Sequence, residues 1–446
     1  MKNQRQLRND ALRLCGAALR AVDPAAAVRR HVQIDGSRCG VDGHTFDLDR
    51  VRRVWVLGAG KAAAPMARAL EKLLGDRLRG GLVVTRYGYG LPLRRVELIE
   101  AGHPLPDANS AAAAARIAHI AEREITSRDL VFVLLSGGGS ALMVAPAAGI
   151  RWEDKLACTR LLLRCGATIQ ETNAIRKHLS HLKGGGLARL LSSVPVVSLI
   201  LSDVVGDELD TIASGPLVPD STTFQECVEI LRRLRIKDKV PPAVRERLES
   251  GAAGKIPETP KPGDPIFRRK VNVIVGSNTQ ACTAAANAAR RLGYHTMVLT
   301  SRLEGDTRGA ARFHLGILRE IVAESRPLRR PACLISGGET TVQVAGTGSG
   351  GRNQEFALHC VRGLASLPAA CVGASLATDG TDGPTDAAGA LVDASSLSRS
   401  LKLGANFLTE CQNNNDSYEF FRRLGDAIMT GPTRTNVMDL HIFLLG

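Results

Sequence analysis

Short apolar runs that alternate with helical segments constrain the fold of this chain most strongly. Residues 54–57, 130–135 and 194–201 are such runs, and residues 62–74 and 173–191 are helix candidates. Strands that are apolar on both faces are typical of a parallel sheet covered by helices on both sides. We therefore predict an α/β protein with a doubly wound, mostly parallel sheet in its N-terminal domain and ligands at the carboxyl ends of the strands.

The chain is long enough for two cores, because 446 residues exceed the usual size of one domain. Prolines crowd a charged stretch between residues 241 and 265, and strand candidates resume from residue 271. This change predicts a Rossmann-like domain over residues 1–240, a proline-rich boundary over 241–270 and a smaller α/β domain over 271–446. The apolar tail at residues 440–445 is predicted to be a closing strand.

The composition favours a small anionic ligand. The net charge is +14, but aromatic residues make up only 4% of the chain, so few side chains are available to stack on nucleic acid bases. No segment is apolar for long enough to span a membrane. Ten cysteines without a CxxC pair indicate a reducing, cytoplasmic setting. The arginine-rich N-terminus resembles a mitochondrial transit segment, although Asp10 and Asp23 favour a domain helix.

Two glycine clusters end apolar runs and predict anion-binding loops. Successive backbone N–H groups at a strand end form a nest for an anion, and glycines allow the ligand to approach closely. A tight structural turn is the alternative, and a serine nucleophile is not predicted because the first cluster lacks the GxSxG elbow. The clusters comprise Ser136, Gly137, Gly138, Gly139 and Ser140 in the first half, and Ser336, Gly337, Gly338 and Glu339 in the second.

A further glycine turn contains Gly58 and Gly60 and precedes Lys61. It resembles the dinucleotide fingerprint, but the acid expected about 20 residues later is missing. The next strand candidate ends in Arg86, which could meet the extra phosphate of NADP. The turn is not a Walker A loop, because Trp55 replaces its first glycine. Lys61 is therefore either a neutraliser of phosphate charge or a solvated lysine on a turn.

Two arginines are further candidates for anion contacts. Arg352 follows a glycine pair and precedes Asn353, and its forked guanidinium suits a phosphoryl group or a carboxylate. Arg176 shares a helical face with Ser180 and Lys183, which forms either a basic lip or a solvated surface.

Carboxylates that follow strand candidates predict a magnesium site. Asp203 and Asp207 follow the run at residues 194–201, and Asp379 follows the run at 374–377. Mg²⁺ takes one or two carboxylates together with substrate phosphates. Stabilisation of a helix dipole and a common Asp-Gly turn are the alternatives.

Taken in order over essentially the whole chain, these motifs resemble the class II glycerate kinases, the glycerate 2-kinase family whose C-terminal half is the MOFRL domain. The resemblance also rests on residues 102–107, 173–180, 212–216, 378–386 and 431–437. It implies phosphorylation of D-glycerate, typically to 2-phosphoglycerate, with ATP and Mg²⁺. It also implies an active site in the cleft between the two domains.

The resemblance places the catalytic lysine and arginine of the family on Lys61 and Arg352. The expected substrate contacts are residues 136–140, Arg176 and Asn353, and the expected ATP contacts are Gly58, Gly60 and residues 336–339. D-glycerate and ATP are the expected partners, without nucleic acid or membrane, and the sequence leaves open a homodimer and the choice between O2 and O3. The alternatives are an NAD(P)H-dependent hydroxypyruvate reductase and a non-catalytic sugar-acid sensor.

Overall fold

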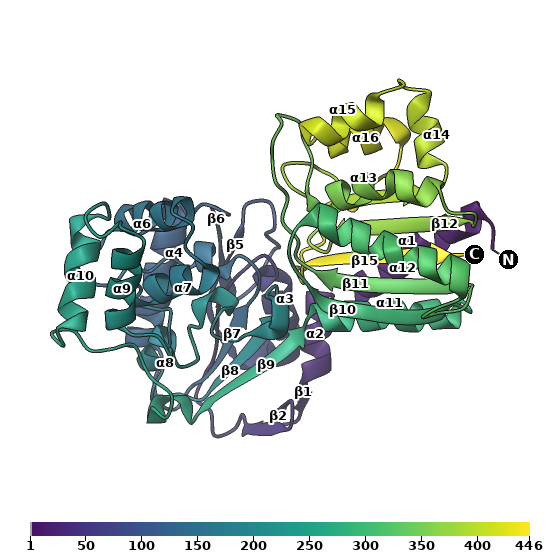
Figure 1. The fold of residues 1–446 in the computed structure, drawn as a ribbon. Helices are drawn as coiled ribbons and strands as arrows, with labels where there is room; N and C mark the ends of the chain where they lie inside the picture. Colours follow the sequence, from purple (N-terminus) through teal and green to yellow (C-terminus); the bar gives the residue numbers. More distant parts are fainter. Residues whose placement is uncertain (1) are drawn as a thin grey trace. The chain divides into compact units, whose positions relative to one another are not determined.

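The computed structural model describes residues 2–446, which form two compact units (Figure 1). One unit is Pro24–Val275, and the other combines the chain up to Asp23 with Gly276–Gly446. None of the helices in the described residues is both long and apolar enough to cross a membrane.

The unit Pro24–Val275 is built on a six-stranded sheet in the order β6–β5–β4–β7–β8–β9. The bounds are β4 Val54–Ala59, β5 Leu78–Arg86, β6 Val96–Ala101, β7 Leu130–Leu135, β8 Val196–Leu201 and β9 Lys270–Gly276. The pairs from β6 through to β8 are all parallel, and β4, β7 and β8 are buried along their full length. The predicted parallel sheet is confirmed.

The order of the strands creates a switch point between β4 and β7. The chain runs outwards from β4 through β5 to β6, and β7 then returns to the other side of β4. At such a point the connections on the two sides diverge and open a crevice at the carboxyl ends of the strands. The loops after β4 and β7 are those that carry Gly60 and Lys61, and residues 136–140.

Helices and a small sheet complete this unit. Among them, α6, α7, α9 and α10 pack together around a separate apolar cluster. The helices are α2 Pro24–His31, α3 Ala63–Leu74, α4 Ala108–His119, α5 Gly139–Leu142, α6 Trp152–Arg164, α7 Ile169–His178, α8 Gly186–Leu190, α9 Phe224–Arg233 and α10 Pro242–Ala252. The small antiparallel sheet contains β1 Val32–Asp35, β2 Arg38–Val41 and β3 His44–Asp47.

The second unit contains a mixed sheet in the order β10–β11–β15–β12–β13–β14. Its strands are β10 His295–Leu303, β11 Ala332–Gly338, β12 Cys371–Ala377, β13 Gly389–Asp393, β14 Ala427–Ile428 and β15 Asp439–Leu445. The predicted closing strand is β15, which lies antiparallel between β11 and β12. As a result, the beginning of β15 lies beside the carboxyl ends of β11 and β12.

Helices pack on the mixed sheet of the second unit (Figure 1). Helices α1 and α11 pack against each other and the sheet, and α12 packs on α13, which contacts β12 and β13. Their bounds are α1 Gln4–Ala21, α11 Asn278–Arg291, α12 Thr307–Glu324, α13 Arg352–Ala365, α14 Ser396–Leu401, α15 Phe407–Asn414 and α16 Ser417–Leu424.

The division into units differs from the predicted boundaries in two places. Helix α1 belongs to the second unit, because its apolar stripe, including Leu7, Leu14 and Ala18, is fully buried and the helix packs on α11 and β12. Strand β9 completes the first sheet, so the chain passes to the second unit after Val275 and not before residue 271. An apolar run shows that a strand forms but not which sheet it joins.

Candidate functional site

The loop after β4 and the loop after β7 are bonded to each other. The backbone N–H of Lys61 donates to the carbonyl of Gly137 at 2.9 Å, and the N–H of Ala62 donates to the hydroxyl of Ser136 at 2.9 Å. Lys61 is only 8% exposed. Its burial argues against the solvated-lysine alternative, because a lysine on a turn normally extends into water.

The glycines of these loops allow a close approach that no other residue permits. A Cβ on Gly60, at φ +142°, would lie 2.1 Å from the Ser136 hydroxyl, and one on Gly58 would lie 2.3 Å from the Leu134 carbonyl. Gly138, at φ +83°, faces the ring of His103, which a Cβ would approach to 2.7 Å. The predicted residues Gly58, Gly60 and 136–140 are therefore gathered at the switch point with Lys61.

Ser140 is linked by hydrogen bonds to side chains outside the glycine loop. Its hydroxyl lies 2.6 Å from that of Ser214, which donates to the Asn173 amide oxygen at 3.4 Å. The ammonium of Lys183 donates to the Ser140 carbonyl at 2.6 Å. These bonds bring α7, which contains Asn173, and the turn before α8, which contains Lys183, against the glycine loop.

Three cations gather here, and none of them forms an ion pair with a described carboxylate. Lys183 is 1% exposed and Lys155 is 4% exposed. Burial lowers the pKa of both ammonium groups well below the ordinary value, and the nearby guanidinium of Arg176 lowers it further. Because buried charges are normally paired, such a cluster is suited to an anionic ligand.

Sequence reasoning found only part of this cluster. The sequence predicts Arg176 and places Lys183 on the same helical face, but α7 ends at His178 and Lys183 lies in the following turn. Lys155 is not indicated by the sequence. It lies within α6 and carries no local motif, so its place beside Arg176 is a product of tertiary packing.

The predicted metal ligands fall in different units. Asp203 and Asp207 follow β8, with Asp207 at φ +61° in a short turn, and Asp379 follows β12. Asp379 accepts a hydrogen bond at 3.0 Å from the Thr381 N–H of its own turn, as the Asp-Gly alternative expects. No group of three potential metal ligands occurs among residues 2–446. Asp203 and Asp207 are thus the two predicted ligands that lie in the same unit.

Arg352 is the first residue of α13, and two carboxylates hold its guanidinium. Nε lies 2.5 Å from Asp439 at the start of β15, and the Glu339 carboxylate accepts from Nη1. Asp439 is fully buried, and burial raises its pKa to about 7 while Arg352 opposes this shift. Three hydrogen bonds to these carboxylates leave part of the five-donor guanidinium for a ligand.

Asn353 anchors the beginning of α13. It is fully buried, its backbone and side-chain N–H groups both donate to Asp382 at 3.1 Å, and its amide oxygen accepts from Ser375. Gln354 donates to the other Asp382 oxygen from its backbone at 2.8 Å and from its side chain at 3.0 Å. These contacts favour an anchoring role for Asn353 over the predicted substrate contact.

We expect Asp382→Ala to lower the free energy of unfolding by about 3–5 kcal/mol, because it leaves four buried N–H donors of Asn353 and Gln354 without their acceptor. Urea denaturation would measure the loss. Asp386→Ala, at an exposed position of the same loop, is the control and should change stability by less than about 1 kcal/mol. Equal effects of the two substitutions would contradict the anchoring role.

The second glycine cluster is explained largely by packing. Ser336 is fully buried beside the His314 imidazole, with Nε2 2.7 Å from its hydroxyl. A Cβ on Gly337 would lie 2.0 Å from the Asn278 side chain, and one on Gly338 would lie 2.2 Å from the Leu303 carbonyl. Among the four predicted ATP contacts of this cluster, only the Glu339 side chain is well exposed.

Glu355 lies one turn after Arg352, and its titration should make stability depend on pH. Burial raises its pKa from the ordinary 4.5 to about 7, and the Ser417 hydroxyl opposes the shift. The folded chain therefore holds a proton that the unfolded chain releases, so stability falls as pH rises from about 4.5 to about 7. Glutamine does not titrate, so we expect the unfolding free energy of Glu355→Gln to fall by up to about 3 kcal/mol less than that of the native protein over this pH range. Parallel slopes for native protein and variant would contradict the shift.

Comparisons with known proteins cover nearly the entire chain. The family model described as "Domain of unknown function (DUF4147)" matches residues 10–249, and the MOFRL family model matches residues 332–439. A protein of Pyrococcus horikoshii named glycerate 2-kinase is 42% identical over 98% of this chain and 97% of its own. One of Thermotoga maritima named D-glycerate 2-kinase is 39% identical over the full length of both.

The chain belongs to the glycerate 2-kinase family. The crystal structure of a glycerate kinase from Thermotoga maritima superimposes with a TM-score of 0.86 at 37% identity and covers 99% of each chain. This agreement confirms the predicted two-domain α/β fold and the predicted family. A relative from Agrobacterium vitis with a provisional hydroxypyruvate reductase name is 41% identical over 88% of this chain.

Proposed function

We propose that this protein phosphorylates D-glycerate with ATP and gives 2-phosphoglycerate. The observation that carries the proposal is Lys61, buried at the switch point and bonded through its backbone to the glycine loop after β7. Full-length relatives named glycerate 2-kinase support the same reaction. A cytoplasmic location follows as part of the proposal, since all ten cysteines are free thiols.

The cations near Ser140 give the substrate carboxylate a binding site. Lys183 already donates to the Ser140 carbonyl, and Arg176 and Lys155 add positive charge. We assign them, together with the glycine loop at residues 136–140, to the carboxylate of D-glycerate. A bound anion offsets the mutual repulsion of the three cations. Because the fold already holds these cations close together, binding the substrate carboxylate is favourable.

Lys61 and Arg352 stabilise the transferring phosphoryl group in this proposal. Charge spreads over the equatorial oxygens during transfer, and a fixed ammonium and a forked guanidinium stabilise that charge. Asp203 and Asp207 would hold Mg²⁺, which supplies neutralisation of ATP phosphate charge when bound. The Glu339 and Asp439 carboxylates fix the Arg352 guanidinium, which limits the reorientation needed during the reaction.

A hydroxypyruvate reductase is the second candidate, because relatives from Agrobacterium vitis carry that provisional name. Parallel assays separate the two functions. One assay couples ADP formation from ATP to added D-glycerate, and the other follows NAD(P)H oxidation with hydroxypyruvate. We expect glycerate-dependent ADP formation without NAD(P)H turnover. NAD(P)H oxidation alone would favour the reductase, and neither activity would favour the non-catalytic sensor.

A further inference from the structure

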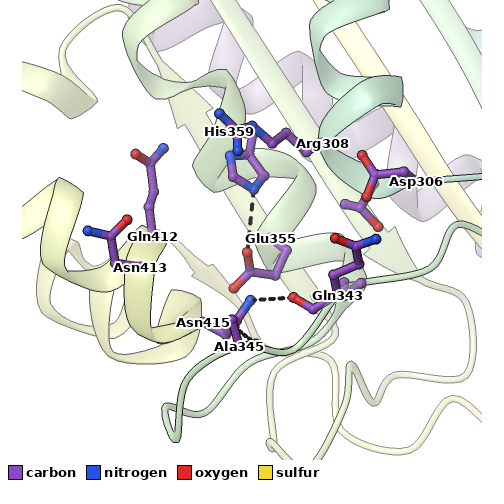
Figure 2. Close-up of a pocket in the computed structure, with 11 residues that line it drawn as sticks. Asp306, Arg308, Gln343, Ala345, Glu355, His359, Gln412, Asn413 and Asn415 are labelled. Atoms are coloured by element: carbon purple, nitrogen blue, oxygen red, sulfur yellow. Dashed lines mark hydrogen bonds and ion pairs between the residues drawn. The ribbon is translucent and has the colours of Figure 1, made fainter.

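A cavity of about 260 Å³ lies in the second unit beside the first two turns of α13 (Figure 2). The beginning of α12, the loop after β11 and the end of α15 complete its wall. Its lining side chains are mostly polar and include two acids, one arginine, one histidine and several amides.

Glu355 is the feature that indicates a ligand. Glu355 is 2% exposed, and its Oε1 atom has no hydrogen-bond partner among the described residues, although the Ser417 hydroxyl is near enough to lower the pKa of this carboxyl group. The other carboxylate oxygen lies 3.7 Å from Nε2 of His359 (Figure 2). Leaving a buried acceptor unpaired is unfavourable, and a ligand hydroxyl that donates to it would recover that cost.

Amide side chains surround this carboxyl group. Gln343 lies on the loop after β11, and Gln412 and Asn413 are at the end of α15 (Figure 2). Asn415 holds the loop, because its amide accepts from the N–H of Ala345 at 2.8 Å and donates to the Gln343 carbonyl at 3.3 Å. Paired donors and acceptors of amides match the N6 and N7 edge of adenine.

Charge and size restrict the ligand further. Asp306 and Glu355 both line the cavity and would repel a phosphate inside it, whereas carboxylates accept well from ribose hydroxyls. The volume is smaller than usual for a complete drug-sized ligand and suits one part of a nucleotide. Among residues 2–446, no group of three side chains is arranged to hold a metal ion.

The position of the cavity relates it to Arg352. Glu355 follows Arg352 by three residues in α13, a rise of about 4.5 Å along the same helical face. Arg308, in the first turn of α12, lines the cavity as well. A nucleoside held at Glu355 would therefore have cationic side chains available for the phosphates attached to it.

We propose that this cavity binds the adenosine part of ATP. Glu355 accepts from the ribose hydroxyls, the amides of Gln343 and Asn413 contact the adenine edge, and the phosphates extend towards Arg352. The inference rests on the proposed function in one respect, that ATP is the phosphoryl donor. It assigns nucleoside recognition to the second unit and not to the glycine turn at Gly58 and Gly60.

Calorimetric titration of the whole protein with adenosine, ATP and inorganic tripolyphosphate tests the assignment. At pH 8, where Glu355 is ionised, we expect Glu355→Gln to weaken adenosine and ATP binding about tenfold, because a neutral amide replaces the charged acceptor, and to leave tripolyphosphate binding unchanged. Glu410→Gln removes the same charge from an exposed position on α15 and should bind all three ligands like the native protein. Gln343→Ala, on the exposed loop, should weaken adenosine severalfold and serves if Glu355→Gln fails to fold.

Native affinity of Glu355→Gln for adenosine and ATP would overturn the assignment, as would equal losses for ATP and tripolyphosphate. Failure of the native protein to bind adenosine would overturn it too. The titrations need neither D-glycerate nor turnover. A protein that binds adenosine at Glu355 but phosphorylates no glycerate would therefore overturn the proposed function and retain this site.

Discussion

Lys61→Ala is expected to lower kcat for glycerate phosphorylation by about 10³-fold or more, with the protein still folded. The ammonium is held at the switch point by a buried backbone, and a preorganised cation next to developing phosphoryl charge is worth several kcal/mol in the transition state. Because the contact strengthens as charge develops, the loss should appear mainly in kcat and less in KM. Steady-state kinetics with varied ATP and D-glycerate would measure both.

The matched control for this variant is Lys72→Ala. Lys72 is an exposed lysine on α3, the helix that follows the Lys61 loop, and its removal changes the net charge equally. We expect native kinetics from it. A value of kcat for Lys61→Ala within threefold of the native value would contradict the role assigned to this residue.

Arg352→Lys is expected to lower kcat by a similar factor, although it retains the positive charge. An ammonium has no rigid fork, so it cannot contact Asp439 and Glu339 and still present directed donors to a phosphoryl group. Arg352→Ala would also leave Asp439 as an uncompensated buried carboxylate, at a cost of about 3–5 kcal/mol in stability. Comparing kcat with thermal unfolding for both variants separates the catalytic loss from the structural one.

Two further variants make the Arg352 measurement specific. Arg362→Ala removes an exposed arginine from the same helix and should leave kcat unchanged. Asp439→Asn combined with Arg352→Ala removes the uncompensated carboxylate, so it should recover stability without recovering turnover. If the double variant recovered kcat as well, Arg352 would act through folding and not on the phosphoryl group.

The parts of the site that could be predicted from sequence are those fixed by local backbone chemistry. A glycine loop that follows an apolar strand is expected at the carboxyl end of a parallel sheet, and Lys61 and residues 136–140 do lie at the ends of β4 and β7. The glycine pair before Arg352 likewise predicts a loop that leads into a helix, and Arg352 is the first residue of α13. These features depend on a few consecutive residues and not on the rest of the fold.

The parts that sequence did not predict depend on contacts between distant residues. Lys155 is a helical lysine whose burial beside Arg176 comes only from packing, and β9 is an apolar run that either sheet could have accepted. Asn353 was assigned to the substrate because an amide after a glycine pair looks the same whether it binds a ligand or a carboxylate such as Asp382. In each case the partner lies far away in sequence.

We propose that this protein transfers a phosphoryl group from ATP to the 2-hydroxyl of D-glycerate. ³¹P and ¹³C NMR of the products formed from ATP and D-glycerate tests it most directly. We predict stoichiometric ADP and 2-phosphoglycerate, with no product when ATP is omitted. A phosphate on O3 would contradict the assigned position of transfer, and the absence of any ATP-dependent phosphoglycerate would contradict the claim itself.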